Sequence, residues 1–346
     1  MSLIAQTISA AERIPLPDLV IRTGIRTLVG RTADRLAHGD ANTDALFAQA
    51  MALRAIAEET AAANTQHYEV PAAFFERVLG PNRKYSSCFY KAGATTLREA
   101  EEEALRQTVE HARLADGQDI LELGCGWGSL SLWMARQFPS ARIVAVSNSH
   151  SQRQFIEAQV AARGLRNLIV ITEDMNVFAP DRSSDRRYFD RIVSVEMFEH
   201  MMNWRALLSR ARAWLKDDGR LFLHIFTHRT GAYLFDRADC EDWIARHFFT
   251  GGVMPSHQLI RQYDDLFEVE REWRWSGTHY ERTAHDWLGN FDARRDEISE
   301  VLRPVYGAET SLWMRRWRWF FLATAGLFGH AAGNEWGVSH YLLKAS

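Results

Sequence analysis

The sequence is poor in features that mark secreted and nucleic-acid-binding proteins. It has 3 cysteines in 346 residues, an odd and widely spaced set that indicates a reducing compartment and not a disulfide framework. Its net charge of -3 argues against a protein that binds nucleic acid by neutralising phosphates. The N-terminus lacks a basic start followed by a sustained apolar stretch, so no secretory signal is expected. We therefore expect a cytoplasmic protein without a nucleic-acid partner.

Long apolar runs are also missing. The longest, residues 319–329, is too short to span a bilayer. It belongs to an aromatic-rich stretch, LWMRRWRWFF, in a chain with 12 tryptophans. Such a stretch fits a core helix, the wall of an acceptor pocket, or a face that touches a membrane interface. Peripheral membrane contact and a homodimer are further predictions.

Strand and helix patterns alternate from residue 119 onward. Short, almost continuously apolar strands are separated by amphipathic helices, which indicates a parallel sheet covered on both faces. The expected strands are 119–123, 141–147, 167–174, 189–196, 219–227, 267–277 and 336–345. Ligands of such sheets bind at the carboxyl ends of the strands.

The domain organisation follows from where this alternation stops. Residues 1–84 read as an N-terminal helical segment, and residues 85–346 as the main domain. Two cap insertions are expected, at about 228–256 and 281–333, the second with two helices. Thr96 followed by Glu99 predicts a helix that begins with a capping box.

A glycine loop follows the first strand in LELGCGWG. Gly124 and Gly126 allow a tight turn and a close approach of backbone to a ligand. The spacing differs from the dinucleotide G-x-G-x-x-G, and the second strand ends without an acid for a ribose. Asp174, at the end of the third strand, can receive an adenine amino group or cap a helix. These features resemble S-adenosylmethionine-dependent methyltransferases.

A cluster of titratable groups follows the fourth strand in SVEMFEHMMNW. Glu196, Glu199 and His200 suit a general base, a metal site or a polar cap. No matching cysteine or histidine pair accompanies them, so no metal is predicted.

A closer resemblance rests on YSSCFY, LELGCGWGSLSL and VEMFEHMMNW. These motifs resemble the joint family of cyclopropane fatty acid synthases and plant coclaurine or pavine N-methyltransferases, from about residue 66 onward. DCEDWIARHFFTGGVMPS and WRWFFLATAGLFGHAAGNEW look like the N-methyltransferase branch. The resemblance implies a Rossmann-like class I methyltransferase fold. Its α/β sheet would have seven mostly parallel strands with an antiparallel last strand, plus N-terminal helices and a helical cap.

The same resemblance implies S-adenosylmethionine as the cofactor and assigns residues to it. The implied cofactor-binding residues are Tyr85, Ser86, Gly124, Gly126, Asn148, Gln152, Asp174 and Met175. Tyr85 and Ser86 would meet the methionine carboxylate and amine, and the glycines would lie beneath the methionine moiety. Asn148 and Gln152 would hold the ribose. Asp174 and Met175 would bracket the adenine.

The two branches of the family imply different acceptors. In the N-methyltransferase branch, a small amine must lose a proton before it attacks. The residues that would line its pocket are Glu69, Glu196, Glu199 and His200. We favour this route, with Glu199 and His200 assisting.

The synthase branch implies an unsaturated fatty acyl lipid, and so a place in lipid metabolism. Its carbon methylation or cyclopropanation would use a bound bicarbonate. Glu199, His224 and Tyr280 stand at the positions that hold this anion, and Ser87 stands at a cysteine position whose backbone also holds it. A cofactor-binding protein without catalysis is a third alternative.

Overall fold

The computed structural model describes residues 3–38, 43–58, 70–93, 96–180, 188–238 and 242–346. The strands are β1 Asp119–Leu123, β2 Arg142–Ser147, β3 Leu168–Thr172, β4 Phe189–Val195, β5 Leu215–His228, β6 Tyr233–Leu234, β7 Val253–Met254, β8 Phe267–Ser276 and β9 Trp336–Ala345. The helices are α1 Leu3–Ala11, α2 Asp18–Ala37, α3 Thr43–Ala52, α5 Ala72–Val78, α6 Leu97–His111, α7 Ser129–Gln137, α8 His150–Arg163, α9 Trp204–Trp214, α10 Trp243–His247, α11 Gly277–Ala293, α12 Arg295–Tyr306 and α13 Thr310–Phe328. Short 3-10 turns are η2 Phe198–His200, η3 Leu259–Tyr263, η4 Gly307–Glu309 and η5 His330–Gly333.

The main sheet has the order β3-β2-β1-β4-β5-β9-β8 in the described part of the chain. Neighbours from β3 to β5 are parallel, and β9 runs antiparallel to both β5 and β8. This confirms the predicted seven-stranded sheet with an antiparallel last strand. The chain reverses its direction of winding between β1 and β4, which is where sheets of this kind bind ligands.

Alternating side chains of the strands give the sheet two apolar faces. Ile120 packs with residues of α6, α7 and α8, whereas its neighbour Leu121 packs with residues of α3 and α9. This alternation is the period of two that a strand imposes. Helices therefore cover both faces, as the apolar strands predicted.

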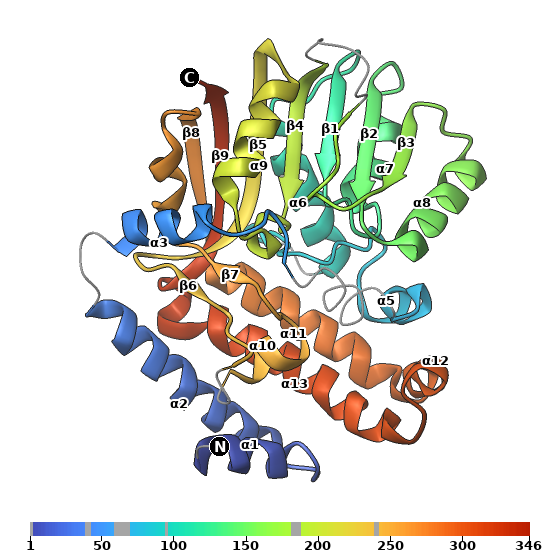
Figure 1. The fold of residues 1–346 in the computed structure, drawn as a ribbon. Helices are drawn as coiled ribbons and strands as arrows, with labels where there is room; N and C mark the ends of the chain where they lie inside the picture. Colours follow the sequence, from blue (N-terminus) through green and yellow to red (C-terminus); the bar gives the residue numbers. More distant parts are fainter. Residues whose placement is uncertain (1–2, 39–42, 59–69, 94–95, 181–187, 239–241) are drawn as a thin grey trace.

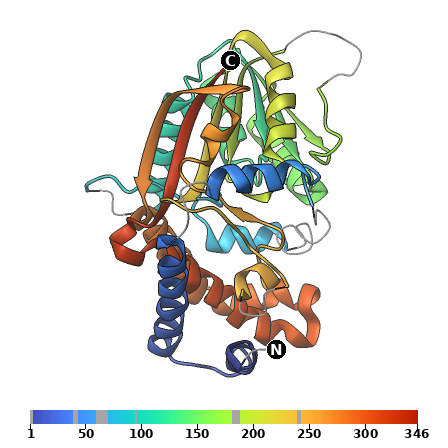
Figure 2. The ribbon, with the colours of Figure 1, turned by 60° about the vertical axis from the view of Figure 1, so that its left-hand side comes forward.

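A second group of helices lies at the carboxyl ends of the parallel strands (Figure 2). Residues of α2, α5, α10, α11, α12 and α13 share one apolar cluster, with Trp287 and Trp317 fully buried in it. The region after β8 holds three helices, so the expectation of two was wrong. The chain leaves α12 at Gly307, whose φ of +52° is a left-handed conformation that favours glycine.

The N-terminal region is helical in its described residues, with α1, α2, α3 and α5. The domain boundary after residue 84 stays a prediction. The capping box of α6 is confirmed. Thr96 Oγ1 accepts a hydrogen bond from the Glu99 backbone N–H at 3.2 Å, and Glu99 Oε2 accepts one from the Thr96 backbone N–H at 3.0 Å.

Candidate active site

A cavity of about 920 Å³ lies between the carboxyl edge of the sheet and the cap. Its walls come from the segments that follow β1, β2, β3 and β4, and from α2, α10, α11 and α13. Pockets for cofactors and drug-sized ligands have volumes of about 300–1,000 Å³. This cavity is large enough for a cofactor together with an acceptor.

The glycine loop forms the floor of this cavity. Gly124 has a φ of +79°, and a Cβ there would lie 2.5 Å from Met197 Cγ. Gly126 has a φ of +52°, but a Cβ there would meet no atom of the described residues within 4 Å. Gly124 is therefore needed for packing, whereas the space at Gly126 opens onto the cavity and admits a ligand.

The residues predicted to bind the cofactor all line this cavity. Gln152 Oε1 accepts a hydrogen bond from Ser147 Oγ at 2.7 Å, which fixes the orientation of its amide. Asp174 Oδ1 accepts one from the Asn176 backbone N–H at 2.7 Å. Asp174 therefore stabilises the turn after β3. No helix begins at this residue in the described segment 168–180, so the alternative prediction of a helix cap was wrong.

Unsatisfied polar atoms test whether a ligand fits here. Trp127 and Ser129 both line the cavity. Trp127 Nε1 and Ser129 Oγ are buried and have no hydrogen-bond partner among the described residues. Buried donors of this kind are rare without a partner. Together with the open space at Gly126, they fit a polar ligand that lies over the glycine loop.

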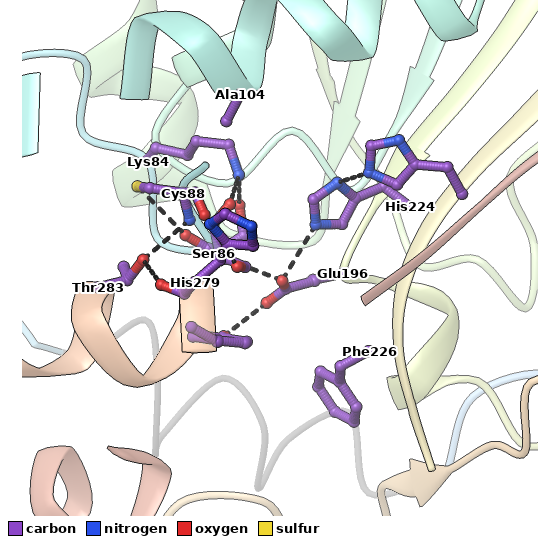
Figure 3. A network of polar contacts seen from close by, with 12 residues as sticks. Lys84, Ser86, Cys88, Ala104, Glu196, His224, Phe226, His279 and Thr283 are labelled. Atoms are coloured by element: carbon purple, nitrogen blue, oxygen red, sulfur yellow. Dashed lines mark hydrogen bonds and ion pairs between the residues drawn. The ribbon is translucent and has the colours of Figure 1, made fainter. Parts of the chain in front are cut away.

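Glu196 is the centre of the polar network shown in Figure 3. Oε1 accepts a hydrogen bond from the Ser87 backbone N–H at 2.9 Å and lies 3.2 Å from His224 Nε2. Tyr280 donates its hydroxyl to Oε2 at 2.7 Å. Three of the groups predicted to hold a bicarbonate therefore converge on the carboxylate of Glu196.

The backbone of Glu196 is in an unusual conformation. Its φ is +47°, in the left-handed region that few residues other than glycine adopt without cost. Strain of this kind is found mostly at functional sites, where the surrounding structure maintains it. It aims the carboxylate into the network and toward the cavity.

Two opposing effects set the charge of Glu196. Burial raises the pKa of this carboxyl above its usual range, and the nearby Lys84 ammonium and the hydrogen bonds from Ser87 and Tyr280 oppose that rise. Lys84 is buried too, and its Nζ donates to Ser86 Oγ and to the Ser87 carbonyl. A carboxylate with three donors and a cation near it can ionise inside a largely dry site.

Glu199 differs from Glu196 in burial and partners. It is fully buried, and it is not among the residues that line the cavity. Oε1 accepts a hydrogen bond from the Phe226 backbone N–H at 2.7 Å, and Oε2 has no partner among the described residues. Burial, and then the charge of Glu196, raise the pKa of Glu199 well above its usual range. The neutral acid is therefore favoured at this position.

The two predicted histidines differ in their surroundings. His200 lines the cavity, and its ring lies 4.4 Å from that of Phe249. His224 is fully buried on β5, and burial lowers its pKa well below the usual range, so the ring is neutral. Glu69 lies outside the described residues.

Sequence reasoning missed two kinds of residue at this site. Lys84 precedes a recognised motif, but a single lysine carries no signal of burial. His340, on β9, lies against His224, and only the pairing of β5 with β9 reveals that neighbour.

Among the described residues, no group of three or more histidine, cysteine, aspartate and glutamate side chains could hold a metal ion. None of the described helices has the length and apolarity to cross a membrane.

Comparison with known proteins agrees with this geometry. The chain matches the mycolic acid cyclopropane synthetase family over residues 56–332. It is 35% identical to (S)-coclaurine N-methyltransferase of Thalictrum flavum subsp. glaucum, across 99% of this chain and 96% of that protein. It is 29% identical to cyclopropane-fatty-acyl-phospholipid synthase of Escherichia coli (strain K12), across 79% of this chain and 66% of that protein.

A solved structure gives the same result in three dimensions. A crystal structure of coclaurine N-methyltransferase bound to N-methylheliamine and SAH matches this chain with a TM-score of 0.92 and 32% identity. The match covers 99% of this chain and 100% of the other. The fold, the glycine loop and these relatives define an S-adenosylmethionine-dependent methyltransferase of class I. Within that class, the chain belongs to the mycolic acid cyclopropane synthetase family.

Proposed function

We propose that the protein methylates the nitrogen of a small amine, with Glu196 as the general base. When bound, S-adenosylmethionine supplies an electrophilic methyl group. The amine is a cation in neutral water and must lose a proton before its nitrogen can attack. The similarity to coclaurine N-methyltransferase over nearly the whole chain supports an amine acceptor.

The position of the Glu196 carboxylate is the observation that carries this proposal. It faces the cavity and is 7% exposed, whereas Glu199 is fully buried with a pKa well above its usual range. A base must reach the proton that it removes, and it must be ionised to accept that proton. Glu196 meets both requirements better than Glu199.

The same carboxylate weighs against the bicarbonate route. The donors of Ser87, His224 and Tyr280 point at Glu196, so a bound bicarbonate would compete with a covalently tethered carboxylate for them. A tethered group binds without the loss of translational freedom that a free ion suffers. We infer that Glu196 replaces the free anion.

The cap supplies an aromatic wall for the acceptor. Trp243, Phe249, Trp319 and Phe320 line the cavity from α10 and α13 and from the chain between α10 and β7. The aromatic stretch near residue 319 therefore contributes to a pocket wall, one of its three predicted roles. Aromatic faces attract both apolar bodies and cations, so we propose an amine with an apolar, ring-sized body. His200 and Glu69 stay proposed acceptor-side residues.

Carbon methylation of an unsaturated lipid is the second candidate, supported by the similarity to the Escherichia coli synthase and by the presence of His224 and Tyr280. The deciding assay measures transfer of a labelled methyl group to a panel of amines and to vesicles of unsaturated phospholipid, each with and without bicarbonate. We expect label in amines, independent of bicarbonate. Label in lipid alone, and only with bicarbonate, would overturn the proposal. Cytoplasmic location, peripheral membrane contact and a homodimer stay predictions.

A further inference from the structure

Three histidine side chains, His224, His340 and His111, form a hydrogen-bonded chain that begins at Glu196 and is called the file below. His224 Nε2 lies 3.2 Å from Glu196 Oε1, and His224 Nδ1 lies 2.8 Å from His340 Nε2. His340 Nδ1 lies 2.7 Å from Nδ1 of His111. His224 and His340 are fully buried, whereas His111 is half-buried. The file therefore connects the proposed base with a histidine that solvent can reach.

The pairing of strands builds this file. His224 on β5 stands directly opposite His340 on β9, and His340 stands opposite Trp273 on β8. Residues that are directly opposite in an antiparallel pair present their side chains on the same face. α6 ends at His111, whose ring stacks on Trp273 with centroids 3.9 Å apart and an angle of 6°. The row therefore runs from His224 on β5 through His340 on β9 to His111, which stacks on Trp273 of β8.

When Glu196 is ionised, one arrangement of the ring protons gives every contact in the file a donor and an acceptor. The carboxylate accepts only, so His224 must donate from Nε2, and its Nδ1 is then an acceptor. His340 must in turn donate from Nε2, and its bare Nδ1 accepts from His111 Nδ1. The second nitrogen of His111, Nε2, is left without a proton. The reverse set would place a bare His224 Nε2 against the carboxylate.

We propose that His340 and His111 are positioning residues that act through His224 to keep Glu196 ionised. This inference rests on the proposed role of Glu196 as the base. Each ring fixes the tautomer of the next, as the buried partner of a catalytic histidine fixes its tautomer in a hydrolase triad. With the file intact, the donor from His224 always faces Glu196, and the base is ready for each acceptor.

The charge states of the rings agree with this arrangement. Burial lowers the pKa of His224 and of His340 well below the usual range, and it lowers that of His111 to about 4. All three rings are therefore neutral at pH 7 and carry one proton each. The titratable and charged groups near the file or Glu196 are Lys84, Cys88, Arg106, Glu110, Glu199, Arg271 and Tyr280.

Nitrogen NMR of the full chain tests the tautomers directly, without any acceptor. Protein labelled with ¹⁵N at histidine should show His224 and His340 protonated on Nε2 and His111 protonated on Nδ1. The signals are assigned by loss of one histidine at a time. A file with the opposite tautomers, or with an imidazolium at neutral pH, would contradict the proposal. This readout is independent of the acceptor, so its failure is distinct from failure of the amine assay.

Two variants of the half-buried His111 separate a positioning role from a packing role. His111→Phe retains the stack on Trp273 but removes the donor, whereas His111→Asn loses the stack and keeps an N–H near the place of Nδ1. We expect the acidic limb of the pH profile of kcat/KM to move up in His111→Phe. The shift should be about half a pH unit, the lower range for one hydrogen bond between neutral groups. His111→Asn should restore the profile of the native protein.

If His111 acted only through packing, the larger shift of the pH profile would occur in His111→Asn, because only that variant loses the aromatic stack on Trp273. His285→Phe is the matched control, since His285 is a half-buried histidine on α11 outside the file. Its profile should equal that of the native protein. An unchanged profile in His111→Phe, or a larger shift in His111→Asn than in His111→Phe, would overturn the proposal.

Discussion

Replacing each of the two buried glutamates by glutamine separates their roles. Glu196→Gln leaves one carbonyl oxygen and one NH₂ group where the donors of Ser87, His224 and Tyr280 converge. The amide cannot accept the proton of an ammonium substrate. Losing a general base typically lowers turnover by about 10²–10⁴-fold, and we expect a loss in that range.

Glu199→Gln should have a much smaller effect. The oxygen of an amide can replace Oε1 as the acceptor from the Phe226 backbone N–H, and the amide NH₂ takes the place of an oxygen without a partner. The burial that raises the pKa of Glu199 favours the neutral carboxyl. An amide is therefore a close substitute, and turnover should stay within about threefold because the one hydrogen bond is kept.

Single-turnover methyl transfer from labelled S-adenosylmethionine measures both variants at saturating amine, and calorimetry measures their cofactor affinity. The affinity should be close to native in both, since neither side chain is among the residues assigned to the cofactor. A loss in Glu199→Gln as large as that in Glu196→Gln would refute the assignment of the base. Native turnover in Glu196→Gln would refute it as well.

Three further predictions follow from the geometry. Gly126→Val should abolish binding of S-adenosylmethionine in calorimetry, because φ is +52° and the new side chain would fill the open floor of the cavity; undiminished affinity would contradict the cofactor site. Tyr280→Phe removes a donor to the carboxylate, so the pKa of Glu196 rises further and the acidic fall of kcat/KM should begin at a higher pH; a profile that moves to lower pH would contradict the network. Thr96→Ala removes a confirmed capping box and should lower the free energy of unfolding by about 1 kcal/mol in urea titration, with turnover unchanged; equal stability would mean that α6 does not need its cap.

The sequence predicted the sheet and the location of the site because both follow from local patterns. Short apolar strands and a glycine loop directly after the first strand place the cavity at the carboxyl edge. The residues assigned to the cofactor by resemblance also line that cavity. Most of them stand in segments that follow a strand, so the topology places them. Tyr85 and Ser86 precede the first strand of the sheet, and only the resemblance pointed to them.

The roles of Glu196 and Glu199 could not be separated from sequence alone. The two residues are three positions apart, and which of them faces the cavity depends on the left-handed φ of Glu196 and on the short turn η2. Backbone conformation of that kind leaves no mark in the residue type. The contacts of His224 with His340 and of His340 with His111 depend on the insertion of β9 between β5 and β8, and no sequence period specifies such a long-range register.

Rescue of a Glu196→Gly variant by bicarbonate is the most direct test of the central claim, that a tethered carboxylate serves where a free anion otherwise would. Glycine adopts the positive φ of this position readily, so the fold should persist while the carboxylate is lost. We expect native methyl transfer to be unaffected when bicarbonate is stripped. The variant should be inactive in stripped buffer and should regain activity as bicarbonate or formate is added. A native enzyme that stops without bicarbonate, or a variant that is active without any anion, would contradict the claim.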